Sequence, residues 1–305
     1  MHVLAFFRFF LVSTLYFHVA NFSHASDIRI SKCTKNFAKH VESSNILVKA
    51  EYNEFGQLTA YQNKYLVARP ILTNRSIVAF VFGQSNAANH AEKLFSSDNC
   101  NVLNYSKGNY YFAQDPLLGS DGTAGSPWVL TANKLIKDGL ADKVVLIPAA
   151  VSGTSVSQWR HGGRLYAMLI DRLEDAKLKG VSPTHFLWHQ GESDHPLTKD
   201  SLGLEDYKNG MIEIISLTKK YLPDSKFFIA VATRCSDSRP PNHPLQDVQR
   251  RLTSLDGVFL GPNTDRIGND HRVDGCHLSA SGIDSHSDGW VSAIKLEAKY
   301  IDLKN

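Results

Sequence analysis

The stretch Ile77-Val78-Ala79-Phe80-Val81-Phe82 is followed at once by Gly83-Gln84-Ser85-Asn86. Six consecutive apolar residues, most of them β-branched or aromatic, predict a strand that is buried on both faces. Strands of this kind belong to parallel sheets covered by helices, and ligands bind such sheets beyond the carboxyl ends of the strands. The stretch therefore favours an α/β fold whose functional site lies at the end of this strand.

The alternation of strand and helix continues along the chain. We expect further strands at 144–148, 184–189, 227–232 and 258–260, and helices at 128–139, 164–179, 204–221, 245–255 and 281–300. The segment 87–92 has a helical composition, whereas 98–127 is rich in Asn, Gly, Ser, Asp and Pro and predicts a long loop. Strands separated by helices indicate βαβ units and a parallel sheet with helices on both faces.

The amino-terminal part of the chain has a different character. Residues 1–25 have a weakly basic start, an apolar centre and a Ser23-His24-Ala25 ending, the pattern of a secretory signal peptide. An uncleaved anchor and a core helix are the alternatives. Residues 26–75 are polar and irregular, with a strand-like piece at 46–48, and we interpret them as an elaboration of a catalytic domain at 76–305. A signal peptide predicts a secreted or periplasmic protein.

The overall composition excludes several classes of protein. Of 305 residues, 43% are apolar and 21% are charged, which suits a packed core and excludes general disorder. The 33 basic and 30 acidic residues leave a net charge of +3, too small for a dedicated nucleic-acid binder. No apolar run after the first 30 residues is long enough to span a membrane, so we expect no stable span once the signal is cleaved.

The sequence contains four cysteines, at positions 33, 100, 235 and 276. An even number in an oxidising compartment suggests two disulfide bonds, and four cysteines allow three pairings. We favour Cys235–Cys276 with Cys33–Cys100, because each pair ties neighbouring parts of one layered structure. Four buried free thiols are the alternative. No Cys-x-x-Cys motif is present, so a thiolate zinc site has no support.

Polar and glycine-rich clusters follow the predicted strands at 83–86, 149–155 and 190–194, and a further cluster lies at 274–277. A serine hydroxyl becomes a nucleophile when a histidine takes its proton, and an acid fixes the tautomer of that histidine. Ser85, His277 and Asp274 supply these three parts. The three-residue spacing of Asp274 and His277 brings both side chains to one face of a turn.

Cleavage of an ester also needs donors aimed at the negative charge that develops on the carbonyl oxygen. The backbone amides of Ser85 and Gly153 and the side-chain amide of Gln190 are candidates for this oxyanion hole. Glycine suits the role because a residue without Cβ lets the backbone approach the substrate. Glu192 is a supporting residue, expected to hydrogen-bond backbone near the site and to hold Gln190.

Four motifs together resemble the blocks of the SGNH (GDSL-like) hydrolases. They are Gly83-Gln84-Ser85-Asn86, Gly153-Thr154-Ser155, Trp188-His189-Gln190-Gly191-Glu192-Ser193-Asp194 and Asp274-x-x-His277. The resemblance covers roughly 76–300 and is strongest to the branch of the sialate O-acetylesterase domain and related carbohydrate acetylesterases. It implies a three-layer α/β/α sandwich with a mostly parallel, flavodoxin-like central sheet. It also implies a Ser85 nucleophile, a His277 base, an Asp274 acid and no metal or other cofactor.

The sequence thus predicts an exported serine esterase that removes O-acetyl groups from a carbohydrate, with an acetylated carbohydrate or a small ester as its partner and no nucleic acid. A short-chain lipase or lysophospholipase is the alternative within this class. A non-catalytic carbohydrate-binding protein and a metal-dependent hydrolase using His185, His189 and His271 are alternatives outside it. Trp159 is a candidate for stacking on a sugar, and Arg160 and Arg234 for attracting an acidic one, against the ordinary roles of packing and surface charge.

Overall fold

The computed structural model describes residues 50–236 and 238–302. The predicted signal peptide, the strand-like piece at 46–48 and Cys33 lie outside these residues. An eight-stranded sheet forms the centre of the described part. In spatial order its strands are β10 (Val258–Asn263), β9 (Lys226–Val231), β8 (His185–His189), β4 (Ser76–Gly83), β7 (Lys143–Pro148), β5 (Val102–Ser106), β6 (Asn109–Phe112) and β3 (Leu66–Val67).

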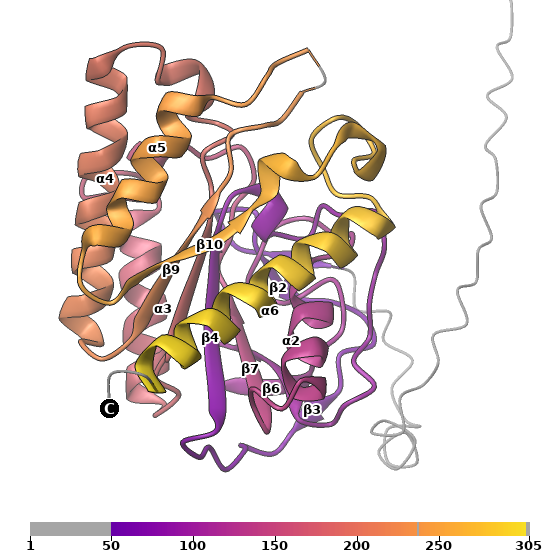
Figure 1. The fold of residues 1–305 in the computed structure, drawn as a ribbon. Helices are drawn as coiled ribbons and strands as arrows, with labels where there is room; N and C mark the ends of the chain where they lie inside the picture. The colour runs from indigo at the N-terminus through magenta and orange to yellow at the C-terminus, as the bar shows by residue number, and fades with distance from the viewer. Residues whose placement is uncertain (1–49, 237, 303–305) are drawn as a thin grey trace, which may run out of the picture.

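The sheet is mostly parallel, as the alternation of elements predicts. Strand β6 alone runs antiparallel to its neighbours β5 and β3. A second, two-stranded sheet pairs β1 (Glu51–Tyr52) with β2 (Leu58–Ala60). The described α-helices are α2 (Trp128–Lys137), α3 (Tyr166–Leu178), α4 (Ser201–Tyr221), α5 (His243–Arg251) and α6 (Ala280–Asp302). Helices α3, α4 and α5 cover one face of the large sheet, and α2 and α6 cover the other (Figure 1).

Strand β4 shows why the apolar run has no polar alternation. All eight of its residues are buried. Because successive side chains of a strand point to opposite faces, Val78, Phe80 and Phe82 pack in the layer of α3, α4 and α5. Their neighbours in the strand pack under α2 and α6. The fold is therefore the predicted three-layer α/β/α sandwich, with β4 at its centre.

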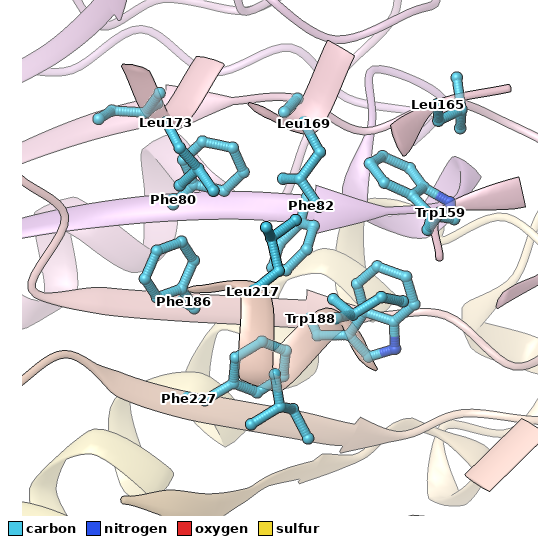
Figure 2. Close-up of a cluster of buried hydrophobic side chains, with 14 of the residues drawn as sticks. Phe80, Phe82, Trp159, Leu165, Leu169, Leu173, Phe186, Trp188, Leu217 and Phe227 are labelled. Carbon is cyan, nitrogen blue, oxygen red and sulfur yellow. The ribbon is translucent and has the colours of Figure 1, made fainter. Parts of the chain in front are cut away.

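An aromatic cluster lies directly below the end of β4. The ring of Phe82 lies with its centroid 4.8–6.1 Å from five other rings, those of Phe80, Trp159, Phe186, Trp188 and Phe227. All five pairs meet edge to face, which is a favoured geometry for aromatic rings. Figure 2 shows this cluster between the sheet and the leucines of the helices. It gives the turn at 83–86 a rigid base.

The structure differs from the sequence prediction at two places between β4 and α2. The expected helix at 87–92 is absent: a single 3₁₀ turn at Ser85–Ala87 is followed by irregular chain. Both ends of the Asn89 side-chain amide bind the backbone of Leu117, at 2.8 and 3.0 Å. Asparagine competes with helix formation through such contacts with the backbone. Here the bonds between Asn89 and Leu117 hold the chain in an irregular course instead of a helix.

The second difference is the predicted long loop at 98–127, which contains the hairpin of β5 and β6. Lys107 and Gly108 form its turn, both with positive φ, at 47° and 81°. This is the backbone twist that two-residue hairpin turns require. Strand β6 then pairs with β3. The segment expected to be an elaboration thus supplies the edge strand of the main sheet.

Two further expectations concern the whole chain. Cys235 and Cys276 are disulfide-bonded, as predicted. Cys100 is disulfide-bonded as well, while Cys33, its expected partner, lies outside the described residues. No helix within 50–236 and 238–302 combines the length and apolar character needed to cross a bilayer.

Candidate active site

The turn after β4 places Ser85 at the carboxyl edge of the sheet. Gly83 has a φ of 122°, and a Cβ there would lie 2.0 Å from the carbonyl oxygen of His189. Only glycine allows β4 and β8 to approach so closely at this point. The Gln84 amide then donates to the same His189 carbonyl at 3.0 Å. Ser85 follows as the first residue of the 3₁₀ turn and is 3% exposed.

The loop between β10 and α6 carries the predicted base and its acid. The orange-yellow part of the ribbon in Figure 1 shows this loop at the carboxyl end of the sheet. His277 Nδ1 lies 2.6 Å from Asp274 Oδ2, and the His277 and Cys276 amides donate to Asp274 Oδ1 at 2.7 and 2.9 Å. With the Nδ1 proton held by the carboxylate, Nε2 of His277 keeps its lone pair free to accept a proton.

The same hydrogen bonds control the charge of Asp274. Its partial burial acts to raise the pKa, but the backbone and side-chain hydrogen bonds from His277 and the amide of Cys276 outweigh this and hold the pKa below its ordinary value. Asp274 is therefore an anion at neutral pH. An anion beside Nδ1 fixes the tautomer and favours the protonated ring once Nε2 has taken a proton.

Several contacts hold the segment after Ser85 against the loop of His277. The side-chain amide of Asn86 donates to the carbonyl of Cys276 at 3.3 Å, and the amide of Glu92 donates to the carbonyl of Leu278 at 2.9 Å. Within the described residues no hydrogen bond joins the Ser85 hydroxyl to the His277 ring directly. Their pairing stays a prediction, since catalytic hydrogen bonds often tighten only when substrate is bound.

A buried arginine supports the loop from below. The guanidinium of Arg272 donates to the carbonyls of Ile267 at 3.2 Å and Thr264 at 2.9 Å, and also to the carbonyl of Cys276. Three backbone acceptors on one side chain fix the course of the loop on both sides of Arg272. The disulfide from Cys276 to Cys235 adds a covalent bond to the loop that follows β9.

The loop after β7 carries Gly153. Its φ of 67° favours glycine, while a Cβ there would meet nothing within 4 Å, so backbone conformation and not space selects the residue. Gly153 is exposed, and its amide has no hydrogen-bond acceptor among the described residues. The Ser85 amide, at the start of the 3₁₀ turn, has none there either. Two amides of this kind can donate to an oxyanion.

Gln190 lies at the carboxyl end of β8 but points into the protein. Its amide nitrogen donates to the Thr154 carbonyl at 2.9 Å and to the Asp194 carboxylate, and the side chain is fully buried. Burial raises the pKa of Asp194 to about 6, against the lowering effect of hydrogen bonds from Gln190 and the amide of Val156. In this arrangement Gln190 holds the residue next to Gly153 and offers no free N–H to a substrate.

Glu192 belongs to a buried chain of polar side chains. Its Oε1 accepts from the Asn86 amide at 3.0 Å and lies 3.0 Å from His189 Nε2, while His189 Nδ1 lies 2.8 Å from Nε2 of His286. Burial acts to raise the pKa of Glu192, but His189 and the hydrogen bonds from His189 and Asn86 lower it. Outside its own backbone, the hydrogen-bond partners of the Glu192 carboxylate are thus side chains, and Gln190, which the sequence suggested, is not among them.

The other residues that the sequence suggested for binding a sugar make contacts within the protein. Trp159 is 0% exposed and packs in the aromatic core, so it is not a sugar platform. Arg160 pairs with Asp206 at 2.7 Å, and Arg234 contacts Asn269.

The three histidines of the metal alternative do not converge. His185 and His189 stand at opposite ends of β8, and His271 is exposed with its Nδ1 2.8 Å from the Ser281 hydroxyl. Among the described residues no three or more His, Cys, Asp or Glu side chains are grouped to hold a metal ion.

Two residues near the site, His90 and Asp121, belong to none of the sequence motifs. The ring of His90 stacks on that of His277, with centroids 5.6 Å apart and planes 29° apart. Asp121 Oδ1 lies 3.4 Å from His90 Nε2, and its Oδ2 accepts the amide of Ser152 at 2.9 Å. Both residues lie in irregular chain, where no periodicity marks them.

An α/β/α sheet with a buried serine after its central strand, and with a His–Asp pair in the loop before the last helix, has the architecture of the SGNH (GDSL-like) hydrolases. A model of the family described as "Carbohydrate esterase, sialic acid-specific acetylesterase" matches residues 77–285, more than half of the chain. The chain therefore belongs to this family, which places it among the carboxylic ester hydrolases. A probable carbohydrate esterase of Arabidopsis thaliana is 36% identical over 70 residues, which span 23% of this chain and only about a quarter (26%) of that protein.

Solved structures share the fold. The X-ray structure of an Arabidopsis thaliana protein matches with a TM-score of 0.58 and 22% identity, over 72% of this chain and 97% of the other. The structure of NanS matches with a TM-score of 0.53 and 17% identity, over 76% and 100%. A putative GDSL-like lipase from Parabacteroides merdae matches with a TM-score of 0.51 and 18% identity, over 74% and 98%. At these identities the likeness shows the fold alone.

Proposed function

We propose that this protein removes O-acetyl groups from a carbohydrate by a serine esterase mechanism with Ser85, His277 and Asp274. The observation that carries the proposal is the pairing of His277 Nδ1 with Asp274, which leaves Nε2 free. This base stands in a loop that hydrogen-bonds to the residue directly after Ser85. The carbohydrate part of the proposal rests on the family to which the chain belongs, and a sialate is one member of the substrate class.

In the first half-reaction the Ser85 oxygen attacks the acetyl carbonyl carbon while His277 Nε2 takes the hydroxyl proton. The carbonyl electron pair moves to its oxygen, and the amides of Ser85 and Gly153 donate to that oxyanion. When the pair returns, the bond to the sugar oxygen breaks, and His277 gives its proton to this leaving group. Asp274 remains ionised throughout and stabilises the imidazolium.

In the second half-reaction water replaces the sugar. His277 takes a proton from the water, whose oxygen attacks the acetyl carbon bound to Ser85. The tetrahedral intermediate collapses, the bond from the acetyl carbon to the Ser85 oxygen breaks, and His277 gives its proton to that oxygen. Acetic acid leaves and ionises to acetate, which releases the second proton of the water to solvent. No atom outside the chain, the ester and water is required.

Export is part of the same proposal. The disulfide between Cys235 and Cys276 supports it, because structural disulfides form and persist in oxidising compartments. Fractionation of the native host checks this point: activity in the cytosol, with the protein still carrying residues 1–25, would contradict it.

The test is hydrolysis of p-nitrophenyl acetate and of O-acetylated sugars by the purified protein. We expect Ser85→Ala and His277→Ala to lose activity by a factor of about 10³ or more. Ser225→Ala is a matched control, since this buried serine lies at the amino-terminal edge of β9, away from the site. Retained activity in either site variant refutes the mechanism, and faster cleavage of long-chain than of acetyl esters indicates the lipase alternative.

A further inference from the structure

A wall of the candidate site is built from His90, which lies five residues after the predicted nucleophile. Its segment runs alongside the loop of the base. The amide of Glu92 binds the Leu278 carbonyl at 2.9 Å, and the Ala280 amide donates to the Glu92 carboxylate at 2.8 Å. These contacts fix the two chain segments that directly follow His90 and His277. The stacking is therefore a feature of the folded chain and not a chance meeting of two mobile side chains.

The predicted base has few other restraints. The side chain of His277 is 26% exposed, and its Asp274 partner is 51% exposed. One hydrogen bond fixes the direction of Nδ1 but leaves the ring able to tilt about that bond. A neighbouring ring at 5.6 Å, with planes only 29° apart, limits the tilt.

Asp121 connects His90 to the loop that carries Gly153. Its carboxylate faces His90 Nε2 with one oxygen and accepts the Ser152 amide with the other. His90 Nε2 and Asp121 Oδ1 are buried, and within the described residues neither has a hydrogen-bond partner, so the 3.4 Å approach of the two atoms to each other is their nearest polar contact. The backbone of Asp121 is held as well, because its amide donates to Ala150 and its carbonyl accepts from Asn89.

Gly122 makes this close approach possible. A Cβ at this position would lie 2.3 Å from the Asn89 carbonyl oxygen and 2.8 Å from His90 Nε2. Its φ of 80° also favours glycine. The chain therefore has room for the Asp121 carboxylate beside His90 only because residue 122 has no side chain.

We propose that His90 and Asp121 are positioning residues, which hold the face of the His277 ring and couple it to the loop that carries the Gly153 amide. The inference rests on the proposed function, since it assigns these residues to the same reaction. Neither side chain reacts: His90 acts through His277, and Asp121 acts through His90 and Ser152. Because a displacement of about 1 Å in a catalytic group costs up to about 100-fold in rate, loss of either restraint lowers kcat more than it raises KM.

The experiment compares four variants in the p-nitrophenyl acetate assay. His90→Ala removes the ring, and His90→Phe keeps a ring for stacking but loses Nε2. Asp121→Asn keeps an oxygen for the Ser152 amide but loses the charge, and Asp121→Ala loses both contacts. Asp142→Asn is the control, since Asp142 forms an exposed ion pair with Arg75 at the opposite edge of the sheet.

We expect kcat to fall about tenfold or more in His90→Ala and Asp121→Ala, with KM changing less than about threefold. His90→Phe regains most of the loss, and Asp121→Asn lies between wild type and Asp121→Ala. Circular dichroism and labelling by a fluorophosphonate measure the folded and reactive fractions, so a poorly folding alanine variant does not decide the outcome.

A kcat per folded molecule that equals wild type in all four variants overturns the proposal, as does a His90→Phe variant no better than His90→Ala. Failure of the proposed function has a different signature, because then the wild type is inactive or Ser85→Ala remains active.

Discussion

Replacement of Cys235 and Cys276 by alanine tests whether the disulfide stabilises the protein without setting the geometry of the loop that carries His277. The disulfide closes a loop of 41 residues. The chain-entropy relation gives a loss of about 13 cal/mol/K for the unfolded chain, or about 3.9 kcal/mol at 25 °C. We expect the free energy of unfolding to fall by about this amount in the double variant.

The geometry of the folded loop does not depend on the sulfur atoms. The Cys276 carbonyl keeps its bonds from Asn86 and Arg272, and the Cys276 amide keeps its bond to Asp274, because all three involve the backbone. The kcat of the double variant should therefore stay within about threefold of wild type where it is fully folded, since no group named in the mechanism is displaced.

Urea titration followed by tryptophan fluorescence measures the stability, because the four tryptophans are buried. The p-nitrophenyl acetate assay on the same samples measures kcat. A loss of stability below about 1 kcal/mol would contradict the loop-entropy argument. A collapse of kcat in the folded variant would show that the disulfide itself holds the base.

Three further predictions test other parts of the structure. Gly83→Ala should abolish soluble folded protein, because its Cβ meets the His189 carbonyl at 2.0 Å; Gly139→Ala, with a φ of 72° but nothing within 4 Å, should cost only about 1–2 kcal/mol in a urea titration. Asp194 keeps its proton up to about pH 6 in the folded state but loses it near pH 3.8 when unfolded, so its contribution falls as pH rises between these values, by up to about 3 kcal/mol. Asp194→Asn should reduce the fall of the unfolding free energy with pH over this range. Urea titrations at pH 4–6.5 measure it, and the same dependence on pH in the variant and the wild type would contradict the raised pKa of Asp194. Trp159→Ala should lower the free energy of unfolding by about 3–5 kcal/mol, whereas a raised KM for sugars without loss of stability would restore it as a binding residue.

The sequence was sufficient for the framework because strands buried on both faces leave an uninterrupted apolar run. Strand β4 and the helices over it follow from such patterns. The hairpin of β5 and β6 did not, since Val102–Ser106 and Asn109–Phe112 mix polar and aromatic residues among turn formers. Pairing with β7 and β3 decides their structure, and those partners are distant in the sequence.

The candidate site divides in the same way. Ser85, Asp274 and His277 belong to compact motifs, and the bond between the last two is local in sequence. The environment of Gln190 was not predictable, because its amide binds Thr154 across the sheet edge. The position of His90 over His277 likewise depends on contacts between chain segments almost 190 residues apart.

Reaction with a fluorophosphonate, followed by peptide mass spectrometry, tests most directly whether the serine and the imidazole work together. We expect a single adduct on Ser85 in the wild-type protein and a labelling rate that falls at least about 100-fold in His277→Ala. Labelling on another residue, or an undiminished rate without the imidazole, would contradict it.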